Sequence, residues 1–131
     1  MTFRQSTLRW ISRGLLSTAT MFAMVGCGDH KQTPPAIVVA FSTSFPPPTA
    51  LATNATAGIA AVVTNDSSNA GVTFTCLPAG GCGTFTPTSI ASNVPTTYQA
   101  PLVVPQGNTV TVTATSVTDS TKFISATITI Q

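Results

Sequence analysis

From Ala36 onward, hydrophobic residues recur in short runs separated by residues that are typical of turns. The separating stretches include Pro46–Pro48, Asn65–Asn69 and Pro105–Asn108, whose residues favour turns or interrupt the hydrogen bonding of a strand. Turn signals at intervals of roughly eight to twelve residues are typical of a β-sandwich or barrel. Strands are therefore predicted over residues 36–42, 50–53, 57–64, 71–76, 84–87, 96–100, 109–117 and 122–130.

Within these runs, hydrophobic and polar residues alternate with a period of two, most clearly in Thr109–Thr115 and Phe123–Ile130. Such alternation gives a strand one buried face and one solvated face. The short connection Thr118–Thr121 suits an antiparallel hairpin between the last two strands. No helical period of any length follows residue 27, so the predicted fold class is all-β. The residues expected on buried faces are Ile59, Ala61, Val63, Val72, Phe74, Cys76, Val110, Val112, Ala114, Ile124, Ala126, Ile128 and Ile130.

The first 26 residues follow a different pattern. All three arginines of the chain lie within residues 1–13, and residues 14–26 are apolar. A basic segment followed by a short apolar segment is typical of a helical, cleaved signal peptide, and the apolar segment is too short to span a bilayer. We therefore expect residues 1–26 to be a signal peptide and the remainder to be exported.

The residues Met24-Val25-Gly26-Cys27 at the end of this segment resemble the lipobox of bacterial lipoproteins. The resemblance implies that Cys27 is acylated and becomes the new N-terminus. Met24 stands where the motif usually has Leu. The alternatives are a free thiol after ordinary cleavage and a disulfide partner. Residues 27–35 would then form a short tether, which spans roughly 30 Å when extended at about 3.5 Å per residue.

Charge is scarce after the signal segment. The net charge of +2 includes the three arginines, whereas residues 27–131 contain two lysines and three aspartates, a net charge of −1. Nucleic-acid binding requires clustered Lys and Arg, so nucleic acid is not expected as a partner.

Cys76 and Cys82 are close enough in sequence to pair with each other, which leaves Cys27 as the odd cysteine. In an exported protein such a pair is expected to form a structural disulfide. His30, in the tether, is the only histidine, so no metal site, and no cofactor, is expected.

Catalytic chemistry has few candidate residues here. A carboxylate pair could come only from Asp66 and Asp119, which both lie in predicted turns, where Asp serves turn geometry. The same loops could offer oxygen ligands to calcium, although each contains one carboxylate. The threonine-rich strand 109–115 is similar to ice-binding surfaces, but those carry threonine on several adjacent strands. It is expected to be the solvent face of a sheet.

The stretches NATAGIAAVVTNDSSNAGVTFTC, GGCGTFTPT, TTYQAP and TVTVTATSVTDSTK together resemble bacterial immunoglobulin-like domains found in acidobacterial and related surface proteins. The resemblance covers residues 36–131, with Phe74 where such domains often carry Trp. It implies an immunoglobulin-like, two-sheet antiparallel β-sandwich of about seven or eight strands. It also implies a stalk or adhesion module without catalytic residues.

The expected protein is thus a non-catalytic lipoprotein of the cell envelope, exported and held to the membrane by its N-terminal lipid. Its partner would be an unidentified protein or glycan, contacted through loops at one end or through an exposed edge strand. The alternative is a lipoprotein that binds a small ligand such as a carbohydrate. That function usually requires exposed aromatic side chains, and the candidates are Phe41, Phe45, Phe74, Phe85, Tyr98 and Phe123.

Overall fold

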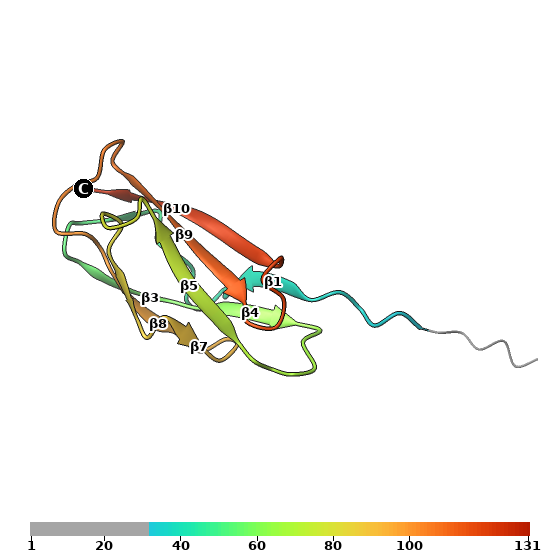
Figure 1. The fold of residues 1–131 in the computed structure, drawn as a ribbon. Coiled ribbons are helices and arrows are strands. Elements are labelled where there is room, and N and C mark those ends of the chain that lie inside the picture. Colours follow the sequence, from blue (N-terminus) through green and yellow to red (C-terminus); the bar gives the residue numbers. More distant parts are fainter. Residues whose placement is uncertain (1–31) are drawn as a thin grey trace, which may run out of the picture. The chain divides into compact units, whose positions relative to one another are not determined.

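The computed structural model describes residues 32–131, which contain ten strands and no helix (Figure 1). Residues 33–131 form one compact unit. The strands are β1 (Val38–Phe41), β2 (Ala50–Leu51), β3 (Thr56–Ile59), β4 (Ala61–Thr64), β5 (Val72–Leu77), β6 (Thr84–Thr86), β7 (Ser89–Ile90), β8 (Thr96–Gln99), β9 (Thr109–Ser116) and β10 (Phe123–Ile130).

One sheet has the strand order β2-β10-β9-β5-β7 and forms the first layer of the sandwich. Its strands pair antiparallel, except that the two-residue β2 runs parallel to the end of β10. The longest pairing joins β9 to β10, from Thr115 opposite Phe123 to Thr109 opposite Thr129. This is the hairpin that the period-two alternation predicts.

The second layer consists of β1 paired with β4, and of β3-β8-β6. Ala60 alone separates β3 from β4, so these two pieces lie on one nearly continuous stretch of chain. The Ala60 amide donates to the Phe45 carbonyl at 2.9 Å, and the Ala60 carbonyl accepts from the Ser42 amide at 2.8 Å. The stretch therefore pairs with β8 through its first half and with β1 through its second half.

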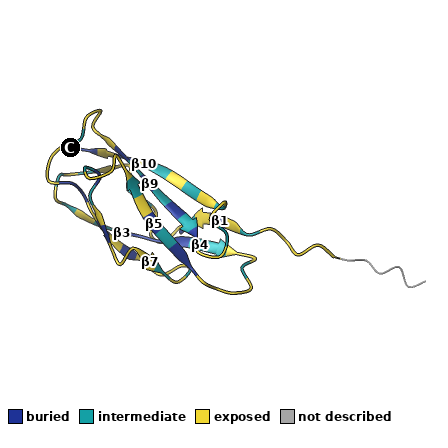
Figure 2. Cartoon of the chain, in the orientation of Figure 1, coloured by how far each residue is buried: buried dark blue, intermediate teal, exposed yellow. Residues whose placement is uncertain are grey.

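The core lies between the two layers: buried residues alternate with half-buried ones along β9 and with exposed ones along the second half of β10 (Figure 2). Phe74, Phe85 and Tyr98 pack at its centre, with ring centroids 5.2 Å apart for the first pair and 4.9 Å for the second. Such tilted aromatic pairs add to the stabilisation that burial of their area provides. The residues predicted on buried faces all belong to this core or pack against its margin.

The all-β sandwich predicted from the sequence is confirmed, with two differences in its strands. The predicted strand 57–64 is two strands, because Ala60 is buried together with Ile59 and Ala61 and breaks the alternation. β7 was not predicted, because Ser89–Ile90 is too short to show a period. The predicted signal helix, Cys27 and His30 lie outside the described residues.

The loops collect at two opposite ends of the sandwich (Figure 1). At the near end, where the described chain begins, the loops 65–71 and 117–122 meet, and the Asn65 side-chain amide donates to the Ala36 carbonyl at 2.9 Å. At the far end lie residues 52–55, 78–83, 101–108 and Gln131; the Asn54 amide donates to the Pro101 carbonyl at 3.0 Å. Between residues 32 and 131 the charged side chains are Asp66, Asp119 and Lys122, and all belong to near-end loops.

Candidate functional site

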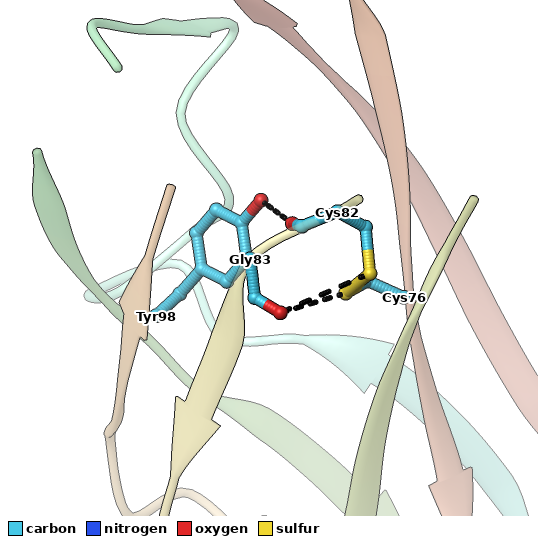
Figure 3. The surroundings of a disulfide bond; sticks show 4 residues. All are labelled: Cys76, Cys82, Gly83 and Tyr98. Atoms are coloured by element: carbon cyan, nitrogen blue, oxygen red, sulfur yellow. Dashed lines mark hydrogen bonds between the residues drawn. A yellow bond between two sulfur atoms is a disulfide. The ribbon is translucent and has the colours of Figure 1, made fainter. Parts of the chain in front are cut away.

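At the far end, a disulfide closes the loop between β5 and β6. Cys76 and Cys82 are bonded, with their Cα atoms 5.8 Å apart, which is typical of native disulfides. The Gly83 carbonyl oxygen lies 3.8 Å from Cys76 Sγ and 4.0 Å from Cys82 Sγ (Figure 3). The bond joins the end of β5 to the residues just before β6, and so fixes the loop that forms one wall of the far end.

The Tyr98 hydroxyl anchors the same loop from β8, by donating a hydrogen bond to the Cys82 carbonyl (Figure 3). The ring is buried in the core, and this burial raises the pKa of Tyr98. Gly83, at φ 94°, packs closely against β8, where a Cβ atom would lie 2.1 Å from the Gln99 carbonyl oxygen and 3.1 Å from the Tyr98 ring. The loop's path therefore depends on a glycine at position 83.

A hollow of about 430 Å³ lies beside this loop. One wall comes from the disulfide loop and the other from the segment that follows β8. The lining residues are Gly80, Gly81, Gly83, Thr84, Gln99, Ala100, Pro101, Leu102 and Val103. None of them carries a titratable side chain, and the glycines leave the backbone accessible.

Hydrophobic side chains protrude around the hollow. Leu102 and Val103, which line it, are 77% and 76% exposed, and the next residue, Val104, is also exposed. Three consecutive exposed hydrophobic residues in one loop lose stabilisation that burial would provide, and such patches mark interaction sites. Sequence reasoning missed this feature, although Leu102-Val103-Val104 stands between two prolines outside any predicted strand.

At the near end, Asp66 binds its own loop and the neighbouring one. Its carboxylate accepts hydrogen bonds from the Ser68 hydroxyl at 2.6 Å, the Ser68 amide at 3.0 Å and the Ala70 amide at 3.1 Å. Thr118, in the other loop, is a further donor, at 2.9 Å from Oδ2. The hydrogen bond from the Ser68 hydroxyl lowers the pKa of Asp66 the most, and the other donors lower it further.

Asp119 lies next to Thr118 along the chain and stabilises a separate turn. Its Oδ1 accepts from the Thr121 hydroxyl at 2.7 Å and from the Thr121 amide at 3.0 Å, and these bonds lower its pKa. The structure thus brings the two predicted aspartates to one end of the sandwich, each in a side-chain-capped turn. Within residues 32–131, no three His, Cys, Asp or Glu residues gather in a metal-binding group.

Residues with hydroxyl side chains line the outer face of three adjacent strands, whereas the sequence pattern pointed to the strand 109–115 alone. Across β5, β9 and β10, one row consists of Thr73, Thr115 and Phe123, and the next consists of Thr75, Thr113 and Ser125. The Thr113 and Ser125 hydroxyls lie 2.8 Å apart. The prediction of β5 rested mainly on its buried residues. It therefore did not anticipate that the hydroxyls on the other face of β5 align with those of β9.

The aromatic candidates divide between the core and the surface. Phe74, Phe85 and Tyr98 are buried, whereas Phe123 is 61% exposed and Phe45 is partly exposed. Phe45, in the segment between β1 and β2, lies over Gly58 in β3, whereas Phe123 starts β10, so the two exposed rings lie at different sheets. Phe123 is therefore a single exposed ring beside the hydroxyl rows.

No family model matches the chain, and no curated protein or solved structure shows significant similarity to it. Among residues 32–131 there is no helix that is long and apolar enough to cross a membrane.

Proposed function

We propose that the protein is an exported, lipid-anchored, non-catalytic module that acts by binding a partner at the far end of its sandwich. The observation that carries this proposal is the far end itself, where Leu102 and Val103 protrude beside a hollow without a titratable side chain. The near-end carboxylates support a non-catalytic function, because Asp66 and Asp119 each hold their own turn. The resemblance of residues 36–131 to bacterial immunoglobulin-like domains also favours an adhesive or spacer role.

Anchoring rests on the sequence before the sandwich. The basic and apolar segments of residues 1–26 are typical of a signal peptide, and Cys27 follows a lipobox-like tripeptide. Two or more acyl chains on Cys27 would keep the protein on the membrane, and the tether would hold the sandwich within roughly 30 Å of it. Export to an oxidising compartment also suits the Cys76–Cys82 disulfide.

Metabolic labelling tests the anchor. In a bacterial host, the full chain should incorporate a palmitate analogue and fractionate with membranes. The Cys27→Ser variant should lose both properties while keeping its disulfide. Unchanged labelling of that variant would contradict lipidation at Cys27.

Site-specific photo-crosslinking tests the far end. A photoreactive amino acid at position 102 in the anchored protein should give a discrete adduct on cells that carry its partner. The same probe at Thr127, on the hydroxyl face, is the matched control and should give none. Equal adducts at both positions, or none at position 102, would argue against a far-end binding site.

Phe123 supports a second candidate function, the binding of a neutral glycan on the hydroxyl face. An exposed ring can stack on a sugar, and Thr115 and Ser125 place hydroxyl groups beside it. Affinity electrophoresis through gels that contain neutral polysaccharides tests this idea. Retardation that Phe123→Ala abolishes and Phe45→Ala preserves would favour it, whereas migration independent of Phe123 would exclude this ring as the platform.

A further inference from the structure

We infer that the partner of the far end is a second copy of this chain, bound far end to far end about a two-fold axis. This inference rests on the proposed function and names the occupant of the same site. It follows from the shape of the far end, from the distribution of charge, and from the direction in which the chain enters the sandwich.

The far end offers both a protrusion and a recess on one surface. Leu102 and Val103 protrude at the rim, and the glycine-lined hollow lies directly beside them. A two-fold interface requires a self-complementary surface, in which each copy provides both halves of the contact. The side chain of Leu102 from one copy can thus enter the hollow of the other, and the reverse contact forms at the same time.

Charge favours this surface over the others that a second copy presents. Burying a charged or hydrogen-bonding group without a partner is costly. The near end carries Asp66, Asp119 and Lys122, and the outer face of β5, β9 and β10 carries rows of hydroxyls. The far-end loops have no charged side chain, so the pairing of two far ends desolvates no Asp or Lys side chain.

The size of the surface sets the expected strength. The contact consists of one hollow with nine lining residues, Leu102 and Val103 among them, whereas a typical interface involves roughly 20–30 residues on each partner. We therefore expect a weak dimer, with a dissociation constant on the order of 0.1 mM. Many copies held on one surface would raise the effective concentration and strengthen attachment through multiple contacts.

The end at which the chain enters the sandwich determines that this pairing would link two separate membrane surfaces. The described chain enters at the near end, and the far end lies opposite (Figure 1). Two sandwiches joined by their far ends therefore place the two entering chains at opposite ends of the dimer. Such an arrangement suits copies anchored on two facing membranes, which is homophilic adhesion.

Sedimentation equilibrium of the exported Cys27→Ser chain tests the dimer, over concentrations that bracket 0.1 mM. We expect a monomer–dimer equilibrium that Leu102→Ser weakens at least tenfold. Val38→Ser is the matched control, because Val38 is 52% exposed at the near end, and it should leave the equilibrium unchanged. Circular dichroism and a second variant, Val103→Ser, distinguish loss of the interface from loss of the fold. A monomer at every concentration, or equal effects at positions 38 and 102, would overturn the inference.

Vesicles that carry the lipidated protein test the orientation. Two differently labelled vesicle populations should cluster, and Leu102→Ser should abolish clustering. Dimers that form only within one vesicle would overturn pairing between surfaces. If the position-102 crosslink described above joins a different protein, the proposed function stands and this inference fails.

Discussion

The hydroxyl of Thr118 lies 3.0 Å from Oδ1 and 2.9 Å from Oδ2 of Asp66, 52 residues away in sequence. This contact joins the β4–β5 loop to the β9–β10 loop. The Ser68 hydroxyl lies 2.6 Å from Thr118 Oγ1 and completes a small network. The ionised form of Asp66 thus holds two loops in position.

Stability should therefore depend on pH in the acid range. Because the pKa of Asp66 is lower in the folded chain than in the unfolded one, its contribution is complete above the unfolded pKa of about 3.9. The contribution is lost as pH falls through the folded pKa. Thermal unfolding followed between about pH 2 and pH 6 should show this decline. Asp66→Asn should be less stable at neutral pH and show a smaller decline; the part that remains belongs to Asp119, whose pKa is also lowered.

Substitution of Gly83 should disrupt the far end. A Cβ atom at this position would lie 2.1 Å from a backbone oxygen, so Gly83→Ala should cost about 3 kcal/mol or more of unfolding free energy. Gly80, at φ 76°, has nothing within 4 Å of its Cβ position. Gly80→Ala should therefore cost only about 1 kcal/mol, from the left-handed backbone alone. Urea denaturation compares the two, and equal losses would contradict the steric explanation.

Loss of the Tyr98 hydroxyl should destabilise the disulfide loop. Tyr98→Phe keeps the aromatic packing but leaves the Cys82 carbonyl without this donor, at a cost of about 1–3 kcal/mol. Tyr98 is the only tyrosine, so its ultraviolet titration can be followed alone. Ionisation in the folded protein should occur above the usual pKa of about 10. The free energy of unfolding should fall as pH rises above about 10, because the unfolded chain loses the Tyr98 proton more readily than the folded chain. A normal titration midpoint would contradict the burial of this hydroxyl.

Removal of the disulfide should have a moderate effect. The six-residue separation of Cys76 and Cys82 closes a small loop, whose constraint on the unfolded chain contributes about 2 kcal/mol. The double variant Cys76→Ser/Cys82→Ser should lose this amount in chemical denaturation and keep the β-sheet circular dichroism spectrum. Reduced wild-type protein is the control and should match the variant. Complete unfolding of both would show that the loop is essential to the fold.

Period-two alternation predicted the strands best where one face is buried throughout. β9 is such a strand, because Val110, Val112 and Ala114 face the core between hydroxyl residues. Alternation failed at Ala60, where the chain changes pairing partner and consecutive residues are buried. It also failed at β7, whose two residues are too few to show alternation and are recognised as a strand only by their pairing with β5.

Asparagine was a strong turn signal. All five asparagines of the chain have left-handed backbone conformations, with φ between 49° and 63°. Asn tolerates this conformation better than other non-glycine residues. Asn65, Asn69 and Asn108 stand in stretches that were predicted as turns, whereas Asn54 and Asn93 mark turns that the prediction did not name.

The far-end site could not be predicted in the same way. Its hollow lies between residues 80–84 and 99–103, which only the pairing of β6 with β8 brings together. Exposure of Leu102 is likewise a property of the loop's path and not of its composition. The sequence favoured loops at one end, or an exposed edge strand, as the contact surface, and the fold decides which loops meet.

The pairing of β1 with β4 and of β2 with β10 has a mechanical consequence. A force that pulls the near and far ends apart acts along the strands, whereas the ladder hydrogen bonds of β1 and β4 run across them. Such a force loads the four-residue β1–β4 ladder in shear, so its bonds must rupture together and cannot open one by one. Parallel pairing of β2 with β10 places a second short clamp in the same load path. The sandwich is thus arranged to bear tension along its long axis.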